Sequence, residues 1–361
     1  MQKKKEDGCL PLNFEDLPNI KPRLTEAQED QISQAPKEEI EVATKFLKEL
    51  QNLLQAKVKD LKNKEEIQNL YDYSFNKLSS MVFPNSCWTS PQEIENKYPD
   101  LEIDITSQFL YKELSYRHVY ARLSNFSAEL RFESWENYKQ LFQVILYSKD
   151  DIELPPQWIW DILDEFLYQF QVNCQWRGKL KEEEFKNYRE MFTSREFWNL
   201  ADVQKILNDL VLKSMIFKMG KTPSDPKILQ DIGKNPQMIH YFGYFSLVSL
   251  LRLNALNGKP NDALTVIEQI DFKKLLIFSK AYPSYISLLF FCGSTYFMVG
   301  KYYATNAIFE ALIIFHNKYK QFFQKYFLLF FCASFFGLLF LFFHFSSLHF
   351  ISFYFLATKP L

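Results

Sequence analysis

The chain has 361 residues, 47% of them hydrophobic, and its 42 basic and 43 acidic side chains leave a net charge of −1. This length allows two domains or one long helical array, and the balanced charge excludes a whole-chain field that would draw the protein to nucleic acid or anionic membranes. Only 9 glycines are present, which favours helices.

The cysteines are scattered, with no Cys-x-x-Cys pair and no histidine at a metal-ligand spacing. Free thiols in a reducing cytosol are the simplest interpretation, so we expect a cytoplasmic protein with no metal site. The segment Met1–Pro22 lacks an apolar stretch and predicts no secretory signal peptide. Gly220-Lys221-Thr222 resembles the end of a phosphate-binding loop, but Met215 stands where its first glycine is required, so no cofactor is expected.

Residues 1–35 are polar and dotted with proline, which predicts a disordered arm because little apolar surface is available for burial. A helix is then predicted from Pro36, since apolar residues recur at spacings of three and four: Ala43, Phe46, Leu47, Leu50, Leu53, Leu54, Val58 and Leu61. Its lysines could contact RNA phosphates, but they interleave with acidic residues, which is typical of a solvated face.

A second helix is predicted from Glu65 to Val82, followed by a loop that extends to about Pro99. Helical patterning resumes near Ile105, where Glu113 and Arg117 are spaced as an i,i+4 ion pair. His118 lies in the same segment without a second ligand or a nucleophile beside it, and we interpret it as structural.

The segment Gln157–Gln171 follows two prolines that can begin a helix but not continue one. Its apolar residues form one stripe: Ile159, Ile162, Leu163, Phe166, Leu167 and Phe170. Asp161, Asp164 and Glu165 invite the alternative of a carboxylate enzyme or metal site, with His118 as acid or base. The periodicity instead points the carboxylates away from the stripe, and no nucleophile or ligand set accompanies them, so no catalytic residue is expected.

From Gly243 onward the sequence changes to short apolar helix-turn-helix units. Two Gly-Lys turns, at Gly258 and Gly300, are each followed by alanine and a second apolar helix, as in tetratricopeptide-like solenoids. We therefore expect an all-α fold with an N-terminal helical domain at 36–236 and a helical-repeat region at 237–325. Arrays of this kind usually bind other proteins.

Specific strings carry more information than periodicity. The runs 110–121, 131–138, 153–171 and 243–253, with a weaker run at 71–78, resemble the family of subunit L of eukaryotic translation initiation factor 3 in order and spacing. The resemblance covers about Ile40 to Lys325. It implies a non-catalytic, cytoplasmic scaffold subunit of the complex that assembles the initiation complex on the small ribosomal subunit, with subunit K as nearest neighbour and mRNA contacted indirectly.

The resemblance also implies a helical-repeat body followed by a PCI domain, in which helices are capped by a winged helix. No catalytic residues are carried over. We expect aromatic residues of the matching strings to serve in the core or at an interface: Tyr111, Tyr116, Tyr120, Trp158, Trp160, Phe166, Phe170 and Tyr244.

After Lys325 the sequence departs from the family, and the charged PCI region is not recognisable. Twelve of the 36 residues from Tyr326 to Leu361 are phenylalanine, and 326–358 contains no charged residue. One interpretation is a membrane-spanning tail, which would make the chain a membrane-anchored helical-repeat adaptor. The other is a translated intron or frameshift, an artefact of the gene model. The transcript sequence across codons 324–331 separates them.

Overall fold

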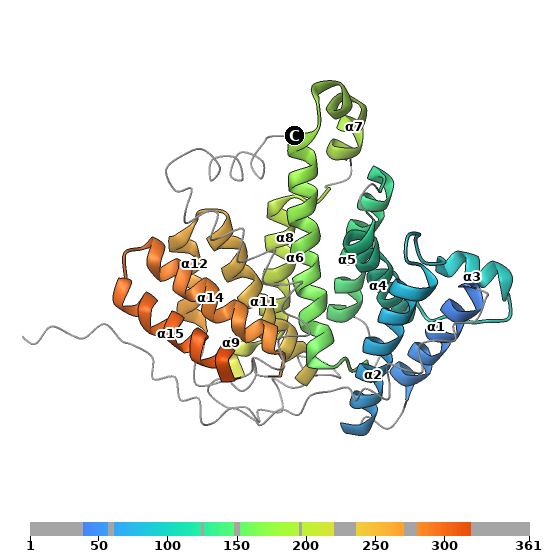
Figure 1. Cartoon of the computed structure of the whole chain (residues 1–361), viewed down its shortest axis with the longest axis horizontal. Helices are drawn as coiled ribbons and strands as arrows, with labels where there is room; N and C mark the ends of the chain where they lie inside the picture. Colours follow the sequence, from blue (N-terminus) through green and yellow to red (C-terminus); the bar gives the residue numbers. More distant parts are fainter. Residues whose placement is uncertain are drawn as a thin grey trace, which may run out of the picture. The chain divides into compact units, whose positions relative to one another are not determined.

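A computed structural model describes residues 39–56, 61–123, 126–147, 152–194, 197–219, 236–270 and 280–318 (Figure 1). The predicted arm 1–35 and tail 326–361 lie outside them. The described residues are helical, with no strand among them, which confirms the predicted all-α class. They group into two compact units. We call residues between 39 and 173 and between 186 and 243 the N-terminal unit, and residues between 174 and 185 and between 244 and 318 the C-terminal unit.

The helices follow one another along the chain, joined by short turns and loops where the connections are described. Their bounds are α1 Glu39–Gln55, α2 Leu61–Lys77, η4 Leu78–Val82, α3 Pro91–Lys97, α4 Ile105–Arg122, α5 Ala128–Tyr147, α6 Pro156–Lys179, α7 Glu182–Ser194, α8 Leu200–Lys213, α9 Ile216–Met219, α11 Pro236–Leu256, α12 Pro260–Gln269, α14 Tyr282–Met298 and α15 Tyr302–Lys318.

Several helix starts are explained by local side-chain chemistry. Ser90 and Glu93 form a capping box at α3, with Pro91 in the first turn. Asp104 accepts a hydrogen bond from the Ser107 backbone N–H at 2.9 Å and so caps α4. These caps satisfy backbone donors that a helix start leaves without an intrahelical partner.

Two sequence predictions need correction. The first helix was expected to continue through Leu61, but α1 ends at Gln55 and Leu61 begins α2. The segment up to Pro99 was expected to be a loop, but it contains α3, whose capping box is a purely local signal that apolar periodicity does not register. The second predicted helix is present as α2, and its last turn, η4, is a π-helix in which the Phe83 N–H donates to the Leu78 carbonyl at 2.8 Å.

The core of the N-terminal unit is aromatic and is centred on α6. The Phe166 side chain is fully buried, and its ring lies 5.1 to 6.2 Å, between ring centres, from the rings of four neighbours: Trp135, Tyr138, Phe142 and Trp198. Trp158 stacks on Tyr71 at 4.9 Å. The predicted apolar stripe of α6 is therefore buried, and the helix packs against aromatic side chains from α2, α5 and the segment before α8.

The C-terminal unit repeats one turn geometry. Gly258 and Gly300 both have positive φ, 67° and 76°. In each turn the following lysine N–H donates to a carbonyl five residues earlier, Lys259 to Asn254 at 3.0 Å and Lys301 to Tyr296 at 2.8 Å. This is the Schellman ending of a helix, which glycine adopts without a Cβ penalty. The Gly-Lys turns thus end α11 and α14 in the same way.

Helices α14 and α15 approach each other closely at Gly293. A Cβ at this position would lie 2.6 Å from the Phe309 ring, so glycine makes room for the partner helix. Farther along the same pair, Tyr285 meets Phe315 edge-on at 4.7 Å. Among the helices of the described ranges, none is both long and apolar enough to span a membrane.

Candidate functional site

The predicted ion pair of α4 lies inside the N-terminal unit. Glu113 is completely buried and Arg117 is 8% exposed. The Arg117 guanidinium donates to Glu113 Oε1 from Nη2 at 2.6 Å and from Nε at 3.2 Å. The Tyr138 hydroxyl donates to the same carboxylate oxygen at 3.1 Å. The pair is therefore a buried, charge-assisted contact and not the surface pair that its spacing alone would suggest.

Arg117 also reaches α6. Its Nη1 donates to the Tyr71 hydroxyl, which donates in turn to Asp161 Oδ2 at 3.0 Å. Nη1 lies 3.9 Å from the same Asp161 oxygen, and Gln157 donates to the other one at 2.8 Å. The Arg117 guanidinium thus lies close to two carboxylates, Glu113 on its own helix and Asp161 on α6.

The α6 carboxylates are predicted to point away from the apolar stripe, but that side is not open to solvent at Asp161, whose side chain is only 24% exposed. Glu165 is also partly buried, and Gln169 donates to it at 3.0 Å. The apolar stripe shows which side of α6 is most hydrophobic, but it does not show that another helix covers the adjoining side. Arg117 compensates for that burial from a different helix.

Burial raises the pKa of both carboxyls, although Arg117 opposes the shift. The pKa of Asp161 rises to about 7, with hydrogen bonds from Tyr71 and Gln157 also acting to lower it. The pKa of Glu165 rises to about 8, against Arg117 and the Gln169 hydrogen bond. Both carboxyls can therefore take up or release a proton near neutral pH. Neither of them lines the pocket described below. Among the described residues, no group of three or more acidic, histidine or cysteine side chains could hold a metal.

His118 secures a loop. Its Nε2 lies 2.9 Å from the Ser86 carbonyl, its ring stacks near Trp88 at 5.9 Å, and burial lowers its pKa. These contacts hold the loop that precedes α3 against α4. The interpretation of His118 as a structural residue agrees with this environment.

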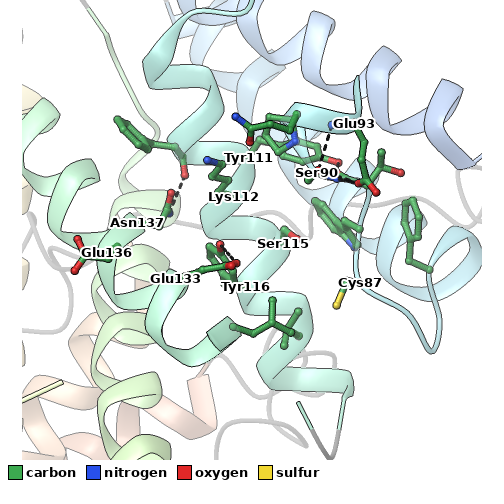
Figure 2. A pocket seen from close by; sticks show the side chains of 18 of the residues that line it. Cys87, Ser90, Glu93, Tyr111, Lys112, Ser115, Tyr116, Glu133, Glu136 and Asn137 are labelled. Atoms are coloured by element: carbon green, nitrogen blue, oxygen red, sulfur yellow. Dashed lines mark hydrogen bonds between the residues drawn. The ribbon is translucent and has the colours of Figure 1, made fainter. Parts of the chain in front are cut away.

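The structure contains a pocket of about 830 Å³ that sequence patterns did not reveal (Figure 2). It is lined by Phe83 and residues 86–90 of the loop before α3, the start of α3, one side each of α4 and α5, and Glu39. At its wall the Tyr116 hydroxyl donates to Glu133 Oε2 at 3.2 Å. Asn137 lies deeper, 5% exposed, and donates to the Phe109 carbonyl at 3.2 Å.

The aromatic residues singled out in the sequence fall in both units, with Tyr244 alone in the C-terminal one. The buried ones are Tyr111, Tyr120, Trp158, Trp160, Phe166, Phe170 and Tyr244. Tyr116 is partly exposed, and it lines the pocket together with Tyr111. No single motif marks the pocket, because its residues come from α1, α3, α4, α5 and one loop. Trp88, a large side chain in a polar loop, was the one local signal.

Comparison with known proteins identifies the family. Residues 130–328 match the family described as RNA polymerase I-associated factor PAF67. The chain is 34% identical over 264 residues to proteins of Xenopus tropicalis, Bos taurus and Homo sapiens, each named eukaryotic translation initiation factor 3 subunit L. These matches cover 72% of this chain and 46% of each relative, so the chain spans about half the length of the curated relatives it matches.

The family match covers more than half of the chain, and it includes the aromatic core around α6 and both Gly-Lys turns. The chain therefore belongs to the PAF67 family, and the curated relatives that it matches are named eukaryotic translation initiation factor 3 subunit L.

Proposed function

We propose that this chain works as a non-catalytic scaffold subunit of eukaryotic translation initiation factor 3. The observation that carries the proposal is the 34% identity over 72% of the chain to proteins named subunit L of that factor. A subunit of a multi-subunit factor has other subunits as partners. In this role the chain would support assembly of the initiation complex on the small ribosomal subunit, with subunit K as its nearest neighbour and mRNA recruited indirectly.

Two features of the fold support a role in protein contacts. The C-terminal unit contains two helix pairs, α11–α12 and α14–α15, each joined by a Gly-Lys turn, an arrangement typical of arrays that bind other proteins. Its helix α15 exposes several large apolar side chains, namely Tyr302 at 63%, Tyr303 at 74%, Ile313 at 59% and Ile314 at 48%. Apolar side chains grouped on one exposed helix are common at subunit interfaces.

The test is co-purification of the tagged full chain from cells in which the remainder of the factor is intact. We expect other subunits of the factor in the eluate and sedimentation of the chain with small ribosomal subunits. The Asp164→Asn variant should behave like the parent, since it changes one partly exposed carboxylate outside the pocket. Sedimentation of the tagged chain as a monomer, with no other subunit recovered, would contradict the proposal.

A second candidate function is a membrane-anchored helical-repeat adaptor, favoured by the uncharged stretch 326–358. Cell fractionation distinguishes the two. The scaffold proposal expects the chain in the ribosomal fraction, and the adaptor proposal expects it in membranes that resist extraction with alkaline carbonate.

A further inference from the structure

The pocket of the N-terminal unit has an excess of negative charge. Glu39, Glu93, Glu133 and Glu136 line it, with Lys112 as the opposing cation. We propose that this pocket binds a basic segment of a second protein and that a lysine or arginine of this segment pairs with Glu133. The proposal rests on the pocket alone and does not depend on which complex the chain joins.

Of the three pocket glutamates on α3 and α5, Glu133 is the one best placed to receive a cation. The Glu93 carboxylate accepts hydrogen bonds from Ser90 at 2.6 and 2.9 Å, and Glu136 pairs with Lys139 at 2.8 Å. Glu133 is exposed and accepts only a bond from the neutral phenol of Tyr116, without a paired cation among the described residues. A positively charged donor would bring the opposite charge that the phenol lacks, so both partners of the contact would be ionised. Figure 2 shows Glu133 beside Tyr116, at the wall of the pocket.

Asn137 provides an independent indication of a ligand. Asn137 is 95% buried and lines the pocket, and its Nδ2 donates a hydrogen bond to the Phe109 carbonyl. Its Oδ1 has no hydrogen-bond partner within the described structure. A buried acceptor without a partner is unfavourable, so a ligand donor that reaches Oδ1 once neighbouring side chains move apart would be stabilised there. Ammonium and guanidinium groups carry several such donors.

The remaining walls suit the apolar stem of a basic side chain. Trp88 and Tyr111 are buried with their rings 5.6 Å apart, and both line the pocket with Tyr116. Aromatic faces attract lysine and arginine cations, and they also cover the methylene groups of those side chains. A volume of about 830 Å³ exceeds the needs of one side chain, so several residues of a segment fit. The same carboxylates repel phosphate, which disfavours RNA as the occupant.

Binding is tested on the full chain with a fluorescent ten-residue peptide of alternating arginine and serine, by fluorescence anisotropy. We expect saturable binding that weakens as salt is raised, because exposed charges are screened. Glu133→Gln should weaken binding by about threefold to tenfold, since it removes one charge-assisted contact. A peptide with glutamine in place of arginine should bind at least tenfold more weakly than the arginine peptide.

Glu129→Gln is the matched control, because Glu129 is exposed on the same helix, one turn before Glu133, and does not line the pocket. It should leave peptide affinity unchanged. Equal losses in both variants, or equal affinity for the glutamine peptide, would overturn the proposal. Unchanged thermal melting of Glu133→Gln would show that its loss of binding does not come from unfolding.

Cys87 gives a readout at the pocket itself. Its thiol is exposed and lines the pocket, whereas Cys174 and Cys292 are buried. The bound arginine peptide should slow alkylation of Cys87, followed by mass spectrometry, at least threefold. Unchanged alkylation at saturating peptide would place the binding elsewhere and overturn the proposal.

Two other occupants are distinguished by the peptide assay and by sedimentation of the chain alone. If changing Lys3, Lys4 and Lys5 to glutamine tightens peptide binding, the pocket is occupied by the chain's own N-terminal segment and not by a second protein. If the chain self-associates and Glu133→Gln abolishes this, the occupant is a second copy. Either result would overturn the assignment to a different protein.

Discussion

At the scale of single residues, Phe166 and Arg117 represent two ways of filling the interior of the N-terminal unit. Phe166 is enclosed by aromatic rings, and Arg117 is enclosed by the oxygens that balance its charge. The first arrangement is stabilised by burial of apolar surface. The second offsets a large desolvation cost, so each member of the network depends on the others.

Phe166→Ala should lower the free energy of unfolding by about 3 to 5 kcal/mol, because it removes a fully buried ring and leaves a cavity among four others. Asp164→Asn, on the same helix but partly exposed, should cost less than about 1 kcal/mol. Denaturant melts of both variants measure the difference. Small losses of equal size would mean that α6 does not pack through Phe166.

The raised pKa values of Asp161 and Glu165 predict a dependence of stability on pH. Between its ordinary value of 4.5 and about 8, Glu165 holds a proton in the folded chain that the unfolded chain has lost. The stabilisation from this group is therefore fully present below about pH 4.5 and is lost as the pH rises toward about 8. The same holds for Asp161 up to about pH 7.

Glu165→Gln removes the titrating group while keeping a side-chain oxygen for Gln169. As the pH rises from about 5 to about 8, this variant should gain about 1 to 2 kcal/mol in unfolding free energy relative to the parent. The size of this gain allows for the partial exposure of Glu165. Urea melts across this range provide the measurement, with Glu129→Gln as the exposed control. Parallel pH profiles for Glu165→Gln and the parent would show that Glu165 is ionised in the folded chain throughout.

At the scale of elements, the turns between helices explain how the C-terminal unit repeats. The Schellman endings of α11 and α14 need a left-handed residue at Gly258 and Gly300. Each ending redirects the chain into the next helix, α12 or α15, which begins two residues after the glycine. The two Gly-Lys turns therefore share one backbone geometry despite weak similarity around them.

Gly300→Ala should cost about 1 to 2 kcal/mol, because alanine adopts φ near 76° only with backbone strain. The space around Gly300 is open, with no atom within 4 Å of an added Cβ, so the loss measures conformation and not a clash. Gly300→Asn should lose less, since asparagine tolerates the left-handed region. Thermal and denaturant melts compare the two variants. An alanine variant as stable as the parent would show that this turn does not constrain the backbone.

At the scale of the whole molecule, charge balance and local charge differ. The net charge of −1 predicts no long-range attraction to polyanions. The pocket nevertheless gathers four glutamates around one lysine from elements that are far apart in sequence. An interaction at that pocket would therefore be short-ranged and set by the geometry of α4, α5 and the loop before α3.

The sequence by itself determined the all-α class, the helix at Gln157–Gln171, the Glu113–Arg117 spacing, the Gly-Lys turns and the family. Each of these depends on contacts within a few residues or on strings that are read directly. Only the tertiary structure decided that Asp161 faces Arg117 through Tyr71, 90 residues away in sequence, and that Glu133 lines a pocket with loop 83–90. Helical periodicity records which side of a helix is apolar, whereas the partner that covers each side is set by how distant segments pack.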